Sequence, residues 1–142
     1  MFCVKEGFLA VIGVIGGVIA YVFGGFDAGL VALVVFMSVD YITGFIVAAV
    51  FHKSKKSEHG SLESGAGFKG LIKKCMCLLF VLIAVRLDAF IGSDLIRDAV
   101  IIAFISNELI SIIENAGIMG VPIPVVITKA IDILSKKGNG GE

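Results

Sequence analysis

The sequence has 142 residues, carries no formal net charge, and is 58% hydrophobic with a mean hydropathy of +1.04. Ordinary soluble domains contain about 45–50% apolar residues, and a chain this short cannot hide the excess in one soluble core. Only 17% of the residues are charged. These values argue against a soluble enzyme and predict a single all-α domain, residues 1–137, embedded in a membrane.

The apolar segments along the sequence predict four membrane-spanning helices. Residues 7–51 are almost uninterrupted apolar sequence, and their helical length exceeds twice a hydrocarbon core of about 30 Å. The glycines of residues 24–27 mark the break between two spans. The expected spans are residues 7–25, 28–51, 71–91 and 96–116. Three spans are the alternative, because the third helix is short and contains Arg86.

A shorter amphipathic helix is expected over residues 124–137. Pro124 suits the first turn of a helix, and apolar residues follow at the spacing of one helical face. Lysines occupy the other faces, which is typical of a helix that lies on a membrane surface. Residues 138–142 are expected to form a disordered tail.

The distribution of basic residues predicts the orientation of the spans. With four spans and a cytoplasmic N-terminus, ten of the twelve Lys and Arg residues are cytoplasmic, as the positive-inside rule requires. Both termini are then cytoplasmic. The ten residues are Lys5, Lys53, Lys55, Lys56, Lys69, Lys73, Lys74, Lys129, Lys136 and Lys137.

Ionisable and amide side chains within the expected spans are the candidate functional residues, because a charge at mid-membrane depth costs about 2.5–3.5 kcal/mol. They are Asp40, Arg86, Asp88, Asn107, Glu108 and Glu114. Asp40 and Glu108 both lie about 18 Å below the outer ends of their helices. Two carboxylates that meet at this depth would not both be ionised unless they faced water.

Two of these residues have several possible partners. Arg86 lies near the outer end of the third span, from which it reaches toward either acid or pairs locally with Asp88 and Asp94. The sequence leaves these alternatives open. Glu114 is expected near the inner interface, with Lys73 or Lys74 as its partner.

The fourth span has small or hydrogen-bonding side chains at every fourth position, a pattern suited to close helix contact. These positions are Ala99, Ala103, Asn107, Ser111 and Asn115. With Glu108 and Glu114 beside them, they form either the lining of a pore or oligomer interface, or a polar seam within one bundle.

Small residues also recur at four-residue spacing in the first two spans, at Gly13 and Gly17 and at Gly44 and Ala48. Such pairs let helix backbones approach closely. Contacts within one chain and contacts between chains both remain open.

No catalytic, metal or cofactor site is expected. His52 and His59 match no metal-ligand spacing, and the glycines of residues 65–70 lack the preceding strand and the Lys-Ser/Thr ending of a phosphate loop. The serines and cysteines have no histidine within the membrane to activate them.

Five short segments, in this order, resemble the toxin-secretion/phage-lysis holin family over about residues 27–134. They are Asp40-Tyr41-Ile42-Thr43-Gly44; Gly67-Phe68-Lys69-Gly70 leading into Lys73-Lys74; Ile105-Ser106-Asn107-Glu108; Ser111-Ile112-Ile113-Glu114-Asn115; and Gly120-Val121-Pro122-Ile123-Pro124. The N-terminal helix lies outside the resemblance.

The resemblance implies a phage or prophage protein of the bacterial cytoplasmic membrane. Such holins form homo-oligomers in the lipid bilayer and open lesions that release an endolysin, or in some relatives a toxin, without requiring contact with it. We expect Asn107 and Glu108 to help line the lesion, and a collapse of the membrane potential to trigger it. The family implies no catalytic residue and no nucleic-acid partner.

Two other functions remain possible at the level of sequence. An antiholin, which binds a related chain without making holes, would share every span. A small proton-coupled transporter would use Asp40 or Glu108 to exchange protons, but the absence of Trp argues against an aromatic cage around either acid.

Overall fold

The computed structural model describes residues 2–56, 59–60 and 63–138, and every regular element in that part of the chain is a helix. The all-α prediction is confirmed. The helices are α1 (Phe2–Val22), α2 (Ala28–Ala49), α3 (Ser64–Ile91), α4 (Leu95–Ile118) and α5 (Val125–Gly138). The expected disordered tail falls on residues 139–142, outside the described residues, and on residue 138, which is the last residue of α5.

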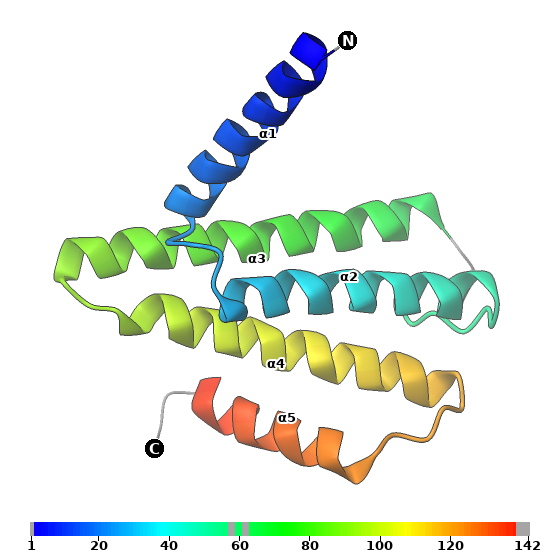
Figure 1. The fold of residues 1–142 in the computed structure, drawn as a ribbon. Coiled ribbons are helices and arrows are strands. Elements are labelled where there is room, and N and C mark those ends of the chain that lie inside the picture. The colour runs from blue at the N-terminus through cyan, green and yellow to red at the C-terminus, as the bar shows by residue number, and fades with distance from the viewer. Residues whose placement is uncertain (1, 57–58, 61–62, 139–142) are drawn as a thin grey trace.

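Helices α2, α3 and α4 lie side by side, α5 folds back along α4, and α1 projects away from this bundle (Figure 1). Apolar side chains from the three central helices meet in one core, where α4 lies between the other elements. The buried members of this core are Leu30, Leu33, Met37, Val81, Ile101 and Ile105.

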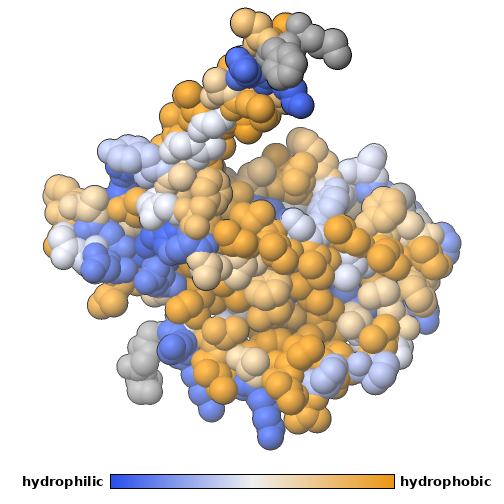
Figure 2. Space-filling model, viewed as in Figure 1, coloured by the Kyte–Doolittle hydropathy of each residue, from blue (hydrophilic) through white to orange (hydrophobic). Residues whose placement is uncertain are grey.

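Two helices are long and apolar enough to cross a membrane within the described residues: Cys3–Val22 of α1 and Ala28–Ala49 of α2. Helices α3 and α4 are not among these candidates, so the prediction of four crossings is not confirmed. The outer surface is nevertheless apolar. Figure 2 shows hydrophobic residues over most of the visible face of the bundle and along α1.

Helix α3 begins at Ser64, seven residues before the expected start of the third span. The sequence of residues 64–70 suggests a loop because it is rich in glycine, which destabilises helix interiors. The structure packs this segment against α2 instead. Gly67 lies beside the hydroxyl of Tyr41, which would be 3.4 Å from a Cβ atom added to Gly67, an ordinary van der Waals distance. The helix ends at Gly92, whose φ of +70° suits glycine.

The bounds of α5 agree with the prediction to within one residue. The sequence predicts that this helix lies on the inner membrane surface. In the structure its apolar face packs on α4, with Ile131 buried and Leu134 against the bundle core.

Candidate functional site

Lys74 of α3 lies between two carboxylates from the neighbouring helices. Its Nζ donates hydrogen bonds to Asp40 Oδ2 of α2 at 2.6 Å and to Glu108 Oε2 of α4 at 2.7 Å. The side chains of Asp40 and Glu108 are only 3% and 7% exposed. An unpaired charge that is buried this deeply is strongly unfavourable. Both carboxylates are paired with the Lys74 ammonium, which therefore joins α2, α3 and α4 at one point.

Polar groups of α2 and α4 complete the surroundings of Asp40. Asn115 Nδ2 donates to Asp40 Oδ1 at 3.3 Å and to Thr43 Oγ1 at 2.9 Å, and the Thr43 hydroxyl donates to the backbone oxygen of Asp40. Lys56 Nζ, from the segment after α2, lies 3.8 Å from Asp40 Oδ2. Two acids and two ammonium groups therefore gather here, and we call Asp40, Lys74, Glu108 and Asn115 the central cluster.

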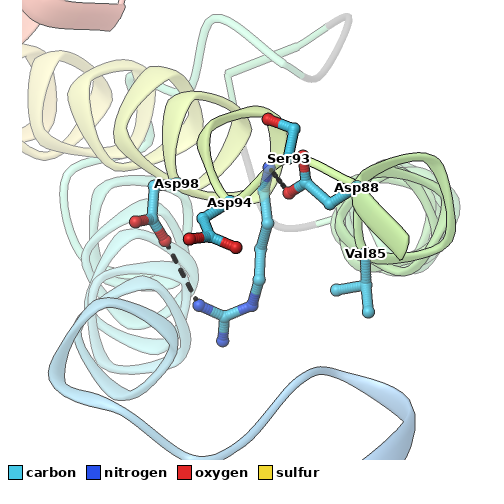
Figure 3. Close-up of a pocket in the computed structure, with 6 residues that line it drawn as sticks. Val85, Asp88, Ser93, Asp94 and Asp98 are labelled. Atoms are coloured by element: carbon cyan, nitrogen blue, oxygen red, sulfur yellow. Dashed lines mark hydrogen bonds and ion pairs between the residues drawn. The ribbon is translucent and has the colours of Figure 1, made fainter. Parts of the chain in front are cut away.

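A second polar cluster closes the opposite end of the bundle, where α3 turns into α4. Asp88 of α3 accepts hydrogen bonds from the backbone N–H groups of Ile96 at 3.0 Å and Arg97 at 2.8 Å. Figure 3 shows Asp88 at this turn together with Ser93, Asp94 and Asp98. The first N–H groups of a helix have no partner within that helix, and the side chain of Asp94, the residue before α4, makes no capping bond. Asp88 of the neighbouring helix α3 accepts hydrogen bonds from these N–H groups in place of Asp94, and it is buried there.

The Arg97 guanidinium ties this cluster to the connection between α1 and α2. It donates to both carboxylate oxygens of Asp27, at 2.7 and 3.3 Å, and to the backbone oxygens of Phe23 and Gly25. Asp27 also accepts from the Leu30 N–H and so caps α2. The hydrogen bond from Arg97, with a further contribution from Leu30, lowers the pKa of the Asp27 carboxyl from its ordinary value.

The structure brings together some of the predicted candidate residues and separates others. Asp40 and Glu108, which the sequence places at equal depth, share the central cluster, and Asn115 joins them. Ser111 is half-buried on the same face of α4, whereas Asn107 and Glu114 are exposed. The expected stripe therefore does not stay on one face, because a four-residue step advances about 40° around a helix.

Arg86 takes neither of its expected partners. Its side chain is exposed, and its guanidinium lies 6.0 Å from the centre of the Tyr21 ring of α1. Of the partners that the sequence leaves open, Asp88 instead accepts hydrogen bonds from the start of α4, and Asp40 and Glu108 bind Lys74.

The sequence places Lys74 near the inner interface, as a possible partner of Glu114, and does not predict its position in the central cluster. A signal was present in the sequence: Lys74, Val81 and Asp88 are spaced by seven residues and so lie on one helical face. The structure buries Val81 and Asp88 on that face.

The two pairs of small residues in the first two expected spans differ in their contacts within the chain. Ala48 is buried, and a Cβ atom added to Gly44 would lie 3.8 Å from Asn115 Nδ2, so this pair packs within the chain. Cβ atoms added to Gly13 and Gly17 would meet nothing within 4 Å. Ala103 of α4 lies against α5, and Ala99 is exposed.

Comparison with known proteins identifies the family. The model of the bacteriophage holin family matches residues 17–136, which include the whole of both polar clusters. The chain belongs to the bacteriophage holin family. The match begins within α1, so most of this helix precedes it.

Relatives of this holin-family chain occur in bacteria and in a phage. An uncharacterized protein of Clostridium perfringens is 36% identical over 98% of this chain and 96% of its own length. Another of Listeria innocua is 38% identical over 89% and 86%. A probable holin of Bacillus phage phi105 is 31% identical over 81% of this chain and 79% of its own. No solved structure matches the chain.

Replacing Lys74 by Met is expected to destabilise the bundle by about 3–5 kcal/mol, because it leaves two buried carboxylates without their cation. Thermal unfolding in detergent measures the effect. Lys73→Met is the matched control, since Lys73 is adjacent and exposed. Equal unfolding temperatures for the two variants would show that the central cluster does not hold the helices together.

The Asp27–Arg97 pair is expected to make stability depend on acidity. Because folding lowers the pKa of Asp27, the pair stabilises the folded chain fully above the ordinary pKa of 3.8 and loses this effect as the pH falls further. Wild type should therefore unfold at a higher temperature than Asp27→Asn at neutral pH, and the difference should shrink below about pH 4.

Asp98→Asn is the control for this experiment. Asp98 accepts a single bond from Arg97, at 3.4 Å, whereas Asp27 accepts two from it and also caps α2. Both side chains are more than half exposed, so the Asp98 pair is expected to contribute little. A pH-independent difference between wild type and Asp27→Asn would contradict the assigned role of the Asp27 charge.

Proposed function

We propose that this chain is a holin that assembles in the cytoplasmic membrane of a bacterial cell and opens lesions through which an endolysin or a toxin leaves, so that the cell lyses. Membership of the bacteriophage holin family, over residues 17–136, is the observation that carries the proposal. The many exposed apolar side chains of the bundle and of α1, in which no described residue is buried, support a bilayer as its surroundings.

We further propose four membrane crossings with both termini in the cytoplasm. Several charges of α3 and α4 have partners inside the bundle, whereas Arg86 and Glu114 are exposed. Lys74 is neutralised by Asp40 and Glu108, and Arg97 pairs with Asp27 at the opposite end. Paired and buried charges avoid most of the cost of facing lipid, so a bundle can insert helices that would not insert singly.

The outward face of α4 is our candidate for the assembly surface. Asn107 and Glu114 are seven residues apart, hence about 10 Å apart on one face of the helix, and both are exposed. Polar groups at membrane depth require a protein partner or water. This face would pair two copies in the intact membrane and line the lesion after assembly. Glu108, which we expected beside Asn107, instead points to Lys74.

Expression from an inducible promoter, with and without a cytoplasmic endolysin, tests the function. A holin should cause a delayed, sudden fall in culture density that requires the endolysin and comes early when an uncoupler is added. Membrane potential recorded in parallel should collapse at the same time. Continued growth with an intact potential would contradict the proposal, and delayed lysis by a co-expressed hole-former would then identify an antiholin.

Asn107→Leu is expected to delay lysis and to reduce the size of cargo released, because it removes a polar group from the proposed assembly surface. Release of endolysin fused to proteins of increasing mass measures the lesion. Ser38→Leu is the matched control: Ser38 is an exposed polar residue of α2 whose hydroxyl already donates to the Val34 backbone oxygen. Unchanged timing and cargo size for Asn107→Leu would exclude the lining role.

A further inference from the structure

Two exposed residues of opposite charge lie at one level of the bundle, on adjacent helices. Lys73 of α3 immediately precedes Lys74, and Glu114 of α4 immediately precedes Asn115. Lys74 and Asn115 both bind the Asp40 carboxylate, at 2.6 and 3.3 Å. The central cluster therefore holds Lys73 and Glu114 close to the level of Asp40. Neither of them takes part in an ion pair with another residue that the structure describes.

The two charges also lie along the boundary between α3 and α4. The rings of Phe80 and Phe104 meet across this boundary, with centroids 6.5 Å apart. Lys73 is seven residues before Phe80, so the two lie on one face of α3. Asn107 and Glu114 follow Phe104 by three and ten residues, which keeps both within about 80° of it around α4. We define the α3–α4 face by its exposed members Lys73, Phe80, Asn107 and Glu114.

Helix α2 lies on the other side of this boundary. Ile101, Phe104 and Asn107 are spaced by three residues, and each step turns about 60° in the same direction around α4. The Ile101 side chain would lie 3.5 Å from a Cβ atom added to Gly29 of α2, and Phe104 meets α3. Asn107 comes next in this order, so it lies beyond α3 and faces away from α2. The α3–α4 face is therefore accessible from outside the bundle.

A second copy of this chain fits the charges of this face. Copies inserted in one membrane share one orientation, so a two-fold axis between them runs along the membrane normal and brings residues of equal depth together. Because Lys73 and Glu114 have similar depth, Lys73 of each copy meets Glu114 of the other, and two ion pairs form reciprocally. An anionic lipid surface fits less well, since it would attract Lys73 but repel Glu114.

We propose that the α3–α4 face is a self-complementary dimer interface, in which Lys73 and Glu114 pair between two copies and Asn107 supplies a hydrogen-bonding group between them. The interface rests on the proposed holin function and deepens it, because it gives the residues and the symmetry through which the outward face of α4 first pairs two copies.

Reciprocal pairing predicts rescue between two charge-reversed chains. A chain with Glu114→Lys carries two cations on its face and a chain with Lys73→Glu carries two anions, so each repels its own copies. A mixed pair, with one chain of each kind, has opposite charges at both contacts. Copies with two different affinity tags are expressed from the same cell and co-purified from membranes in mild detergent, which measures pairing without reference to lysis.

Each variant alone should co-purify about tenfold less than wild type, because two attractive contacts become repulsive, and the mixture should regain the wild-type yield. Glu114→Lys mixed with Lys129→Glu, which reverses an exposed lysine of α5, is the matched control. It should co-purify no better than Glu114→Lys mixed with wild type. Unfolding temperatures in dilute detergent, where chains are separate, should equal that of wild type for both single variants.

A mixture of Glu114→Lys and Lys73→Glu that pairs no better than either variant alone would overturn the interface, as would wild-type copies that do not co-purify. Lysis recorded in the same cells separates this proposal from the function. The mixture should lyse on the wild-type schedule, whereas each variant alone should lyse late. Restored pairing in cells where even wild type causes no lysis would contradict the proposed function and support the interface.

Discussion

The shared ammonium of Lys74 is the interaction on which the rest of the bundle depends. Asp40 and Glu108 are buried on helices that approach each other from different parts of the chain, and two carboxylates there would repel each other without a cation between them. Lys74 supplies that cation from α3. It thereby sets how far α3 slides along α2 and α4, because its Nζ must reach both acids. Asn115 adds hydrogen bonds from α4 that hold Asp40 in the orientation the ammonium requires.

The two polar clusters and the apolar core between them form one insertion-competent unit. At one end Arg97 holds the α1–α2 connection and Asp88 holds the start of α4; the central cluster joins the three helices further along. Leu33 and Val81 pack in the core between these levels with no exposed surface. Four charged residues of these helices, Asp40, Asp88, Arg97 and Glu108, are buried, while many of the large apolar side chains on the same helices are exposed, as suits contact with lipid. Helices with several charges can thus belong to a membrane domain.

Three surfaces remain for interactions outside the bundle: the apolar α1, the polar face of α4 with Asn107 and Glu114, and the part of α4 under α5. They differ in chemistry and therefore in their roles. Helix α1 offers lipid-compatible surface and unfilled space at Gly13 and Gly17, while the α4 face offers polar groups that lipid cannot satisfy. Helix α5 covers part of the surface of α4 (Figure 1).

The sequence by itself determined the helical class, the break at residues 24–27, the existence of α5 and the equal depth of Asp40 and Glu108, because hydropathy, glycine and helical rise are local properties. It also carried the resemblance to the holin family. The tertiary structure decided which charges meet. Lys74 rather than Arg86 reaches the two acids, Asp88 caps the next helix, and α5 packs on α4. These outcomes depend on how helices rotate and slide against one another, so neither spacing nor composition within a single helix could fix them.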